Sequence, residues 1–365
     1  MAFKSPDKII NPFTIIFLAT AVYFFSGCTM VRKYQKNKPF VYKNNIELNI
    51  DDVTPDEKVI IKSRLNTQLD DSSKIKVKDV AFLVHYIDRP PAFDTISARA
   101  SADNMQISLV NLGYYKAKTN YRYVIDSSKK HQKRVTITYI ADAGKRTLID
   151  TFAYMLDKPE LEKLALQTKS ESPLQKGHPV TKAAISQESA RLVDLFRNNG
   201  YYKFTTEELR VTGDTTIEAL TTVSDDPFET LRLLAEANQK RNKPTIKLGM
   251  LLNRTSDTTK LNKYFIRNIY ILPDYTAGDN YTDSSFTENM YEGYTIKFHK
   301  KLFKNNLLAR NMYIKRGTVY SQENYYKTLN SLYKLGVWES PGIDIIEKDS
   351  NQLDLVVKLS PVKKY

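Results

Sequence analysis

Residues that could perform acid–base, nucleophilic or metal chemistry are scattered along this sequence rather than grouped. The chain has four histidines, which are His85, His131, His178 and His299. Their spacing matches no metal-binding or protease motif, and the glycines, 12 among 365 residues, form no phosphate-binding loop. Carboxylate pairs such as Asp51-Asp52 and Asp225-Asp226 fall in expected turns, where they usually cap helices or face solvent. We therefore predict no enzymatic activity, cofactor, metal site or small-molecule substrate.

The only cysteine, Cys28, is the residue whose surroundings most clearly predict a chemical modification. It follows a serine, a glycine and the apolar run 13–25, which is shorter than the roughly 20 residues that a membrane-spanning helix needs. Two lysines precede this run, so residues 1–27 are expected to form a cleavable export signal. The Ser-Gly-Cys sequence resembles the lipobox of bacterial lipoproteins, in which the cysteine sulfur carries a lipid that inserts into a membrane leaflet. The alternative is an uncleaved N-terminal anchor with an incidental cysteine.

The composition indicates folded domains with a positively charged surface. Apolar residues make up 41% of the chain and aromatic residues 11%, enough to build buried cores, and 24 tyrosines favour β-strands. A length of 365 residues suits two or three domains. The net charge of +14 predicts anionic partners such as lipid headgroups or acidic proteins. Nucleic acid is not expected as a partner, because the basic residues are spread along the chain and an export signal is predicted.

One pattern, an amphipathic helix that ends at a glycine and is followed by aromatic residues, recurs three times. The glycines are Gly113 in NLGYYKA, Gly200 in NNGYYKF and Gly336 in KLGVWES. A one-sided apolar stripe precedes each of them, as a core-facing helix requires. We expect each glycine to end its helix in the left-handed conformation, which residues with a Cβ adopt only at a cost. The aromatics that follow are expected to fill the core, with one tyrosine of each pair facing out by strand alternation; contact with a client is the alternative.

The elements around these junctions follow one order, strand, helix, helix, strand, strand, in three successive segments. The opening strands are expected at 46–50, 148–154 and 265–272, and the closing strands at 115–125 and 134–140, at 202–211 and 245–252, and at 338–346 and 353–359. The sequence thus predicts an α+β fold of three tandem modules, each with a three-stranded sheet packed under two helices. The modules are expected at 41–143, 146–254 and 262–361, after a lipidated tether at 28–40, and an insertion at 213–243 interrupts the second.

This order, with its helix–glycine–aromatic–strand junction, resembles the POTRA (polypeptide-transport-associated) domain. Three such modules after an export signal are similar to the periplasmic arm of the BamA/TamA superfamily, and Cys28 narrows the resemblance to lipid-anchored TamA-like or BamA-like proteins of Bacteroidota. The resemblance implies a protein at the periplasmic face of the outer membrane whose partners are an outer-membrane β-barrel and unfolded outer-membrane proteins. Members of the superfamily continue into a membrane β-barrel, whereas this sequence stops at Tyr365. The sequence is therefore expected to be either a fragment or an arm that works with a barrel in trans.

The outer edges of the opening strands are candidates for client binding. An edge strand offers unpaired backbone groups to which an extended polypeptide adds a further strand, and this pairing tolerates many sequences. The predicted edge residues are Ile46, Leu48, Ile50, Leu148, Phe152, Phe265, Ile269 and Ile271. The alternative is that these strands are ordinary sheet edges protected by charge.

Two further segments are candidates for contact with a membrane or a partner. The basic segment 297–316 is expected to be the first helix of the third module, and its cations are predicted to face an anionic membrane; they are Lys297, Lys300, Lys301, Lys304 and Arg310. The alternative is a core-packing helix with a solvated basic side. The insertion 213–243 contains an expected helix at 227–240, and is either a protein contact or a decorated loop.

These inferences favour a periplasmic protein that receives unfolded polypeptides by strand addition and delivers them to an outer-membrane β-barrel. Two other functions stay open. One is a structural scaffold lipoprotein that organises an envelope complex such as the division machinery. The other is a cell-surface binding lipoprotein whose modules only mimic this order.

Overall fold

The computed structural model describes residues 30–50, 53–81, 84–213, 244–253, 257–348 and 351–362. The expected export signal, Cys28, the helix expected at 227–240 and both carboxylate pairs named above lie outside these residues. The chain divides into two compact units, Met1–Thr147 and Leu148–Tyr365. The first unit holds the first of three modules and the second unit holds the other two.

Each module contains the predicted order of strand, helix, helix, strand, strand. The first module has β2 (Pro39–Ile50), α2 (Pro55–Thr67), α3 (Thr95–Asn111), β5 (Lys118–Asp126) and β6 (Lys133–Gly144). The second has β7 (Leu148–Met155), α4 (Pro159–Gln167), α5 (Lys182–Asn198), β8 (Leu209–Gly213) and β9 (Thr245–Leu252). The third has β10 (Phe265–Leu272), α7 (Asn305–Arg310), α8 (Gln322–Lys334), β13 (Gly342–Lys348) and β14 (Gln352–Lys358). In every module the last strand is parallel to the opening strand and antiparallel to the strand between them in sequence. The predicted α+β class is confirmed.

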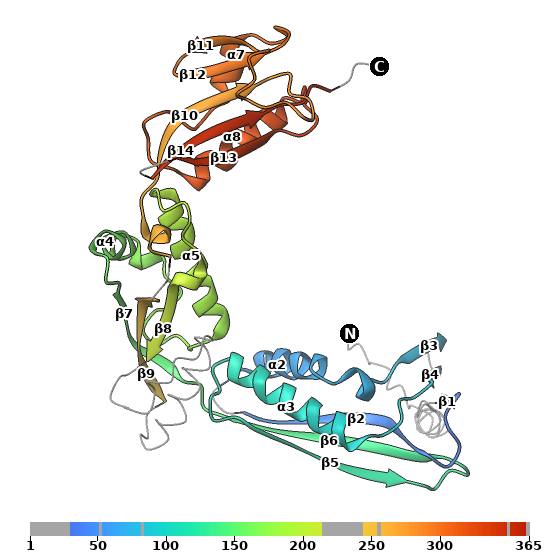
Figure 1. Ribbon diagram of the computed structural model, residues 1–365. Coiled ribbons are helices and arrows are strands. Elements are labelled where there is room, and N and C mark those ends of the chain that lie inside the picture. Colours follow the sequence, from blue (N-terminus) through green and yellow to red (C-terminus); the bar gives the residue numbers. More distant parts are fainter. Residues whose placement is uncertain are drawn as a thin grey trace, which may run out of the picture. The chain divides into compact units, whose positions relative to one another are not determined.

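The first module shows how the sequence produces this layer of helices on a sheet. The N-cap Thr54 accepts a hydrogen bond from the backbone of Glu57 (3.2 Å), and the Asp94 carboxylate caps α3, so both helices begin at a side chain that satisfies free backbone N–H groups. Figure 1 shows α2 and α3 over one face of the sheet β2-β6-β5. The apolar side chains between the layers are buried, among them Leu65, Met105, Leu109, Ile137 and Tyr139.

The three junction glycines adopt the predicted left-handed conformation. Their φ angles are 94° at Gly113, 103° at Gly200 and 65° at Gly336. At the first junction the N–H of Tyr114 donates to the carbonyl of Leu109 (3.0 Å), which closes the end of α3. The predicted alternation of the tyrosine pair is wrong here, because Tyr114 and Tyr115 lie in the turn before β5 and both are buried.

Several elements were not predicted from the sequence. A small sheet of β1 (Met30–Arg32), β4 (Val84–Asp88) and β3 (Val77–Ala81) belongs to the first unit, so the expected tether contains a strand. A hairpin of β11 (Thr287–Tyr291) and β12 (Tyr294–Phe298) precedes α7, and short 3₁₀ helices occupy Asp71–Ser73, Lys169–Glu171, Thr206–Glu208 and Thr258–Leu261. The strand expected at 202–211 begins only at Leu209, because Thr205 and Glu208 form a capping box around one of these 3₁₀ turns.

Candidate functional site: the free strand edges

The opening strands are partly closed along their outer edges. In each module the segment just before the second helix forms a bridge to the start of the opening strand. The bridges are Phe40 with Ala92, Leu148 with Pro179, and Phe265 with Val319. At each bridge a backbone N–H of the opening strand donates a hydrogen bond of 2.9 Å to a backbone carbonyl of that segment. The pairs are Val41 to Pro91, Ile149 to His178, and Ile266 to Thr318. A client strand could therefore pair only with the remaining part of such an edge.

The opening strand of the third module is not an edge. The sheet order is β11-β12-β10-β14-β13, and β12 pairs with β10 in parallel on the side away from β14. The prediction of a free edge along β10 is therefore wrong at Ile271, which pairs with Ile296 of the hairpin, and at Phe265, which bridges to Val319. For Ile269, between them, client binding stays a prediction. The strands β2 and β7 do stand at the ends of their sheets.

The side chains predicted on the opening strands mostly face the cores. Those that are buried are Ile46, Leu48, Phe152, Ile269 and Ile271. Ile50 and Leu148 are half-buried, and Phe265 is exposed. Client binding by these edges therefore stays a prediction that would rest on their backbone groups.

The other end of the first module's sheet is β5, an edge strand of nine residues that the sequence reasoning did not select. In the described part of the chain, β5 pairs only with β6, in antiparallel register. Three consecutive apolar side chains at its end are exposed, Tyr123 at 44%, Val124 at 67% and Ile125 at 44%. Apolar residues on both faces of a strand, where one face should be polar, were the signal available in the sequence.

Contacts to α3 and β2 hold the exposed strand in place, the one to β2 being the ion pair of Arg122 with Glu47 (2.7 Å). Thr119 donates its hydroxyl to the carbonyl of Ala102 (2.7 Å) and Tyr121 donates its hydroxyl to the carbonyl of Thr95 (3.2 Å). The backbone N–H of Tyr121 donates to the side-chain oxygen of Asn120 (2.8 Å), so this N–H is turned away from β6. Because backbone groups alternate along an antiparallel strand, those of Tyr123 and Ile125 point to the same free side.

The closing strands β8 and β13 of the other modules are less suited to strand addition. β8 has five residues, whereas β5 has nine. β13 carries Asp344, which pairs with Lys358 (2.5 Å), and Glu347, which pairs with Lys203 (2.7 Å). Charges along an edge strand oppose pairing with another chain. β5 also carries charges, at Lys118, Arg122 and Asp126, but its run 123–125 is free of them and exposed.

A repeated contact fixes the linker after each of the first two modules. Arg146 lies 4.9 Å from the ring centroid of Tyr114 and pairs with Glu57 at 2.5 Å. Lys263 lies 5.7 Å from the ring centroid of Tyr201 and pairs with Glu160 at 3.4 Å. In both places the next backbone N–H donates to the carbonyl of the junction glycine, at 2.9 Å and 2.8 Å.

The second and third modules meet closely at Gly200. A Cβ on this glycine would lie 3.1 Å from Cγ of Lys263 and 3.3 Å from Cβ of Val319. Polar groups add to the contact, since Asn198 accepts the backbone N–H of Glu323 (2.7 Å). The two modules are therefore joined by specific contacts as well as by the chain.

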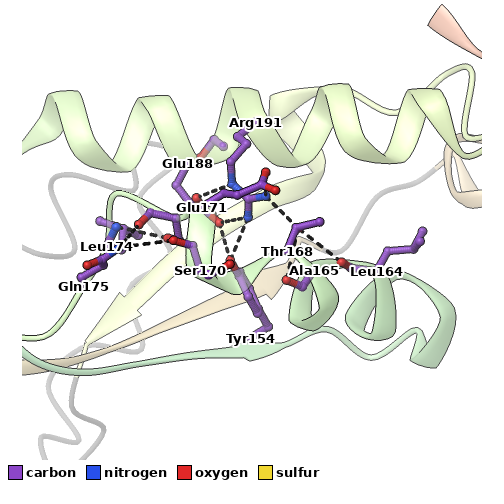
Figure 2. Close-up of polar contacts among 12 residues, drawn as sticks. Tyr154, Leu164, Ala165, Thr168, Ser170, Glu171, Leu174, Gln175, Glu188 and Arg191 are labelled. Carbon is purple, nitrogen blue, oxygen red and sulfur yellow. Dashed lines mark hydrogen bonds and ion pairs between the residues drawn. The ribbon is translucent and has the colours of Figure 1, made fainter. Parts of the chain in front are cut away.

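A buried polar network lies inside the second module (Figure 2). The carboxylate of Glu188 is fully buried, and it accepts a hydrogen bond from the Tyr154 hydroxyl (2.5 Å) and two from the Arg191 guanidinium (2.8 and 2.9 Å). Arg191 also donates to the Thr168 hydroxyl (2.8 Å). Burial, reinforced by Glu188, raises the pKa of Tyr154 above its ordinary value. The network ties α5 to β7 and to the end of α4, which is a structural task.

The predicted membrane-facing cations occupy three different elements rather than one helix. Lys297 lies on β12, is 13% exposed and pairs with Glu288 (3.3 Å), so its placement on a membrane-facing surface is wrong. Lys300, Lys301 and Lys304 are exposed in the loop that follows, and Arg310 is exposed at the end of α7. The expected long helix is shortened to α7 because a buried carboxylate, Asp274, binds the loop backbone at 299–300.

The described residues contain no group of three or more His, Cys, Asp or Glu side chains suited to a metal ion. Among the helices of the described ranges, none has both the length and the apolar character required to cross a membrane.

No protein-family model matches the chain, and no curated protein matches it. Among solved structures it is similar to the third to fifth POTRA domains of BamA from Haemophilus influenzae, with 13% identity over 89% of this chain and 97% of that chain and a TM-score of 0.38. It is also similar to BamA from Haemophilus ducreyi lacking its first three POTRA domains (12% identity, 59% of this chain, 29% of that chain, TM-score 0.35). POTRA domains 1–3 of Omp85 from Anabaena show 9% identity over 90% of this chain and 98% of that chain, with a TM-score of 0.25. With scores this low, the fold assignment rests on the strand order and pairing of the chain itself.

Proposed function

We propose that this chain binds unfolded outer-membrane polypeptides by strand addition at the free edge of β5. The observation that carries the proposal is an edge strand of nine residues with Tyr123, Val124 and Ile125 exposed and outward backbone groups. Such an edge normally carries charge or is covered, because it would otherwise pair with other chains. β5 carries charges at Lys118, Arg122 and Asp126, but its exposed run 123–125 is uncharged. An uncharged run on a strand that contacts α3 suits a protein that accepts extended chains of many sequences.

The binding step requires neither a cofactor nor turnover. A client strand would form main-chain hydrogen bonds with the outward groups of Tyr123 and Ile125, because the N–H of Tyr121 is already bound by Asn120. The exposed apolar side chains would contact alternate side chains of the client on both faces of the sheet. Release then depends only on competition for those client groups, as delivery to a folding β-barrel would provide.

The wider role belongs to the same proposal. A lipid on Cys28 would hold the chain at the periplasmic face of the outer membrane, where the bound client is passed to an outer-membrane β-barrel in cis or in trans. The Ser-Gly-Cys sequence after the apolar run 13–25 supports the anchor, and the three modules of one topology support an arm of the TamA-like or BamA-like kind.

A scaffold lipoprotein is the second candidate. The specific contacts around Gly200 join two modules closely, as a scaffold that holds partners at a fixed spacing would need. A scaffold needs no free strand edge, however, so the exposed β5 favours client binding.

The test compares two substitutions at Ile125. Ile125→Pro removes an outward N–H, and edge strands accept proline when that N–H faces solvent. Ile125→Ala removes the side chain and keeps the N–H. A urea-unfolded outer-membrane β-barrel protein is diluted into each full-chain variant, and its affinity is measured by fluorescence anisotropy. We expect the proline variant to bind about tenfold more weakly, from the loss of one backbone hydrogen bond, and the alanine variant to bind less than threefold more weakly.

Wild-type affinity in the proline variant would overturn the proposal, as would equal weakening by both substitutions. The role in assembly is tested by pull-down of the tagged full chain from cross-linked envelopes. Recovery of an outer-membrane β-barrel with its nascent clients supports assembly, whereas recovery of division proteins without a barrel supports the scaffold.

A further inference from the structure

The loop between β12 and α7, residues 299–304, has a fixed backbone although most of its side chains are exposed. The carboxylate of Asp274, itself 8% exposed, accepts the backbone N–H groups of His299 (2.9 Å) and Lys300 (2.8 Å). At the other end of the loop, the ring of Phe303 lies 4.9 Å from that of Trp338. Trp338 is 2% exposed and donates its indole N–H to the carbonyl of Pro273 (3.0 Å). The loop is thus attached to the core of the third module at two points.

This attachment presents one apolar side chain among three cations. Leu302 is 56% exposed, and Lys300, Lys301 and Lys304 around it are exposed too. Within the described ranges, none of these three lysines forms an ion pair with a carboxylate. A single exposed leucine is ordinary on a protein surface, but here three exposed cations surround it while its neighbour Phe303 is packed inward.

We propose that the loop 299–304 contacts the anionic surface of a lipid bilayer. The three lysines would lie at the phosphate level, attracted by negative headgroups, and Leu302 would enter the boundary between headgroups and acyl chains. Charge complementarity selects an anionic partner. A single apolar tip on a projecting loop favours a fluid surface over an acidic protein, because a lipid surface needs no matching groove or strand edge. The inference is independent of strand addition at β5.

The chain carries its own reporter for this contact. Trp338 is the only tryptophan of the sequence and lies directly against Phe303 of the loop. Full-length protein is reconstituted into vesicles of phosphatidylcholine whose acyl chains carry bromine, with or without phosphatidylglycerol. Bromine quenches tryptophan fluorescence only at short range, so quenching reports that the loop is at the membrane. The same full-length protein, with the same N-terminal segment, is present in both vesicle types. A difference in quenching between them therefore reports the effect of headgroup charge.

We expect quenching of Trp338 in the phosphatidylglycerol vesicles that is lost at high salt and absent in pure phosphatidylcholine. The triple variant Lys300→Gln, Lys301→Gln, Lys304→Gln and the single variant Leu302→Asn should each lose it. A matched control removes the same charge from exposed lysines of the first module, Lys129→Gln, Lys130→Gln, Lys133→Gln, and should retain it. Equal quenching in both vesicle types, no quenching in either, or the same loss in the control variant would overturn the proposal.

Discussion

A comparison of alanine substitutions at Gly200 and at Gly336 separates two effects on stability. One is the strain of a left-handed backbone, and the other is the close contact between two modules. Both residues have a left-handed backbone, with φ of 103° and 65°. An added Cβ at Gly336 would meet no atom within 4 Å, whereas at Gly200 it would lie 3.1 Å from Lys263 and 3.3 Å from Val319. Alanine at either position therefore loses stability through an unfavourable backbone conformation. Alanine at Gly200 also loses stability through a steric overlap.

The expected magnitudes follow from these distances. A φ of 65° is central to the left-handed region, so Gly336→Ala should lower the free energy of unfolding by about 1 kcal/mol. Gly200→Ala adds a less favourable φ and an overlap with Val319, whose backbone is fixed by its bridge to Phe265. The flexible Lys263 side chain can move away, so we expect a total loss of about 3 kcal/mol.

Urea unfolding measures both variants, followed by far-UV circular dichroism and by Trp338 fluorescence. Val319→Gly is the control, because it removes the Cβ that an added methyl group at Gly200 would meet at 3.3 Å. In the Val319→Gly background, Gly200→Ala should cost about 1 kcal/mol less than it costs in the wild-type chain. Equal destabilisation by Gly200→Ala and Gly336→Ala would refute the close contact between the modules. The same cost of Gly200→Ala with valine and with glycine at position 319 would refute it as well.

Two further predictions concern charged groups of the second module. Arg191→Met leaves the buried Glu188 carboxylate without its cation and should lower the free energy of unfolding by about 3–5 kcal/mol. The double variant Arg191→Met, Glu188→Leu should restore most of that loss. Urea denaturation measures both variants, and equal losses in the two would contradict the prediction. The pKa of Glu160 lies below its ordinary value of 4.5, because the Tyr201 hydroxyl and then Lys263 bind the carboxylate. The folded state thus binds fewer protons, so this stabilisation is present above pH 4.5 and is lost as pH falls through the lower, folded pKa. Glu160→Gln should flatten the fall of Tm with acidification in that window, and an unchanged slope would count against the assignment.

Local sequence signals were sufficient for the repeated core of the fold. The strands β9 (Thr245–Leu252) and β10 (Phe265–Leu272) begin and end where the apolar pattern predicts. The junction glycines could be found because a helix end with positive φ has a chemical signature in the chain. The apolar stripe of a helix and the residues of a turn depend only on neighbours a few positions away. These elements can therefore be predicted from a single sequence.

The sequence did not reveal which strands would be edges, because edges depend on pairing between distant segments. The hairpin β11–β12 has a local signal in Glu292-Gly293, whose φ angles of 49° and 84° fit a two-residue turn. Its pairing with β10 has no such signal, and that pairing decides that β10 is internal. The linker cations Arg146 and Lys263 were missed for the same reason, since each meets a tyrosine and a glutamate far away in the sequence.

The three modules differ mainly in where extra chain is added to a common core. The first module adds β3 and β4 between its helices, and the third adds β11 and β12 between its opening strand and α7. The core keeps one strand order in both, because the pairings within it bury the same apolar faces. Additions in loops change which backbone groups stay unpaired without disturbing those faces. The covered edge at β10 is therefore a property of the inserted hairpin, whereas β5, β8 and β13 all stand at the ends of their sheets. Specialisation of β5 for client binding would then depend on its length and on its exposed side chains, and needs no change in the core.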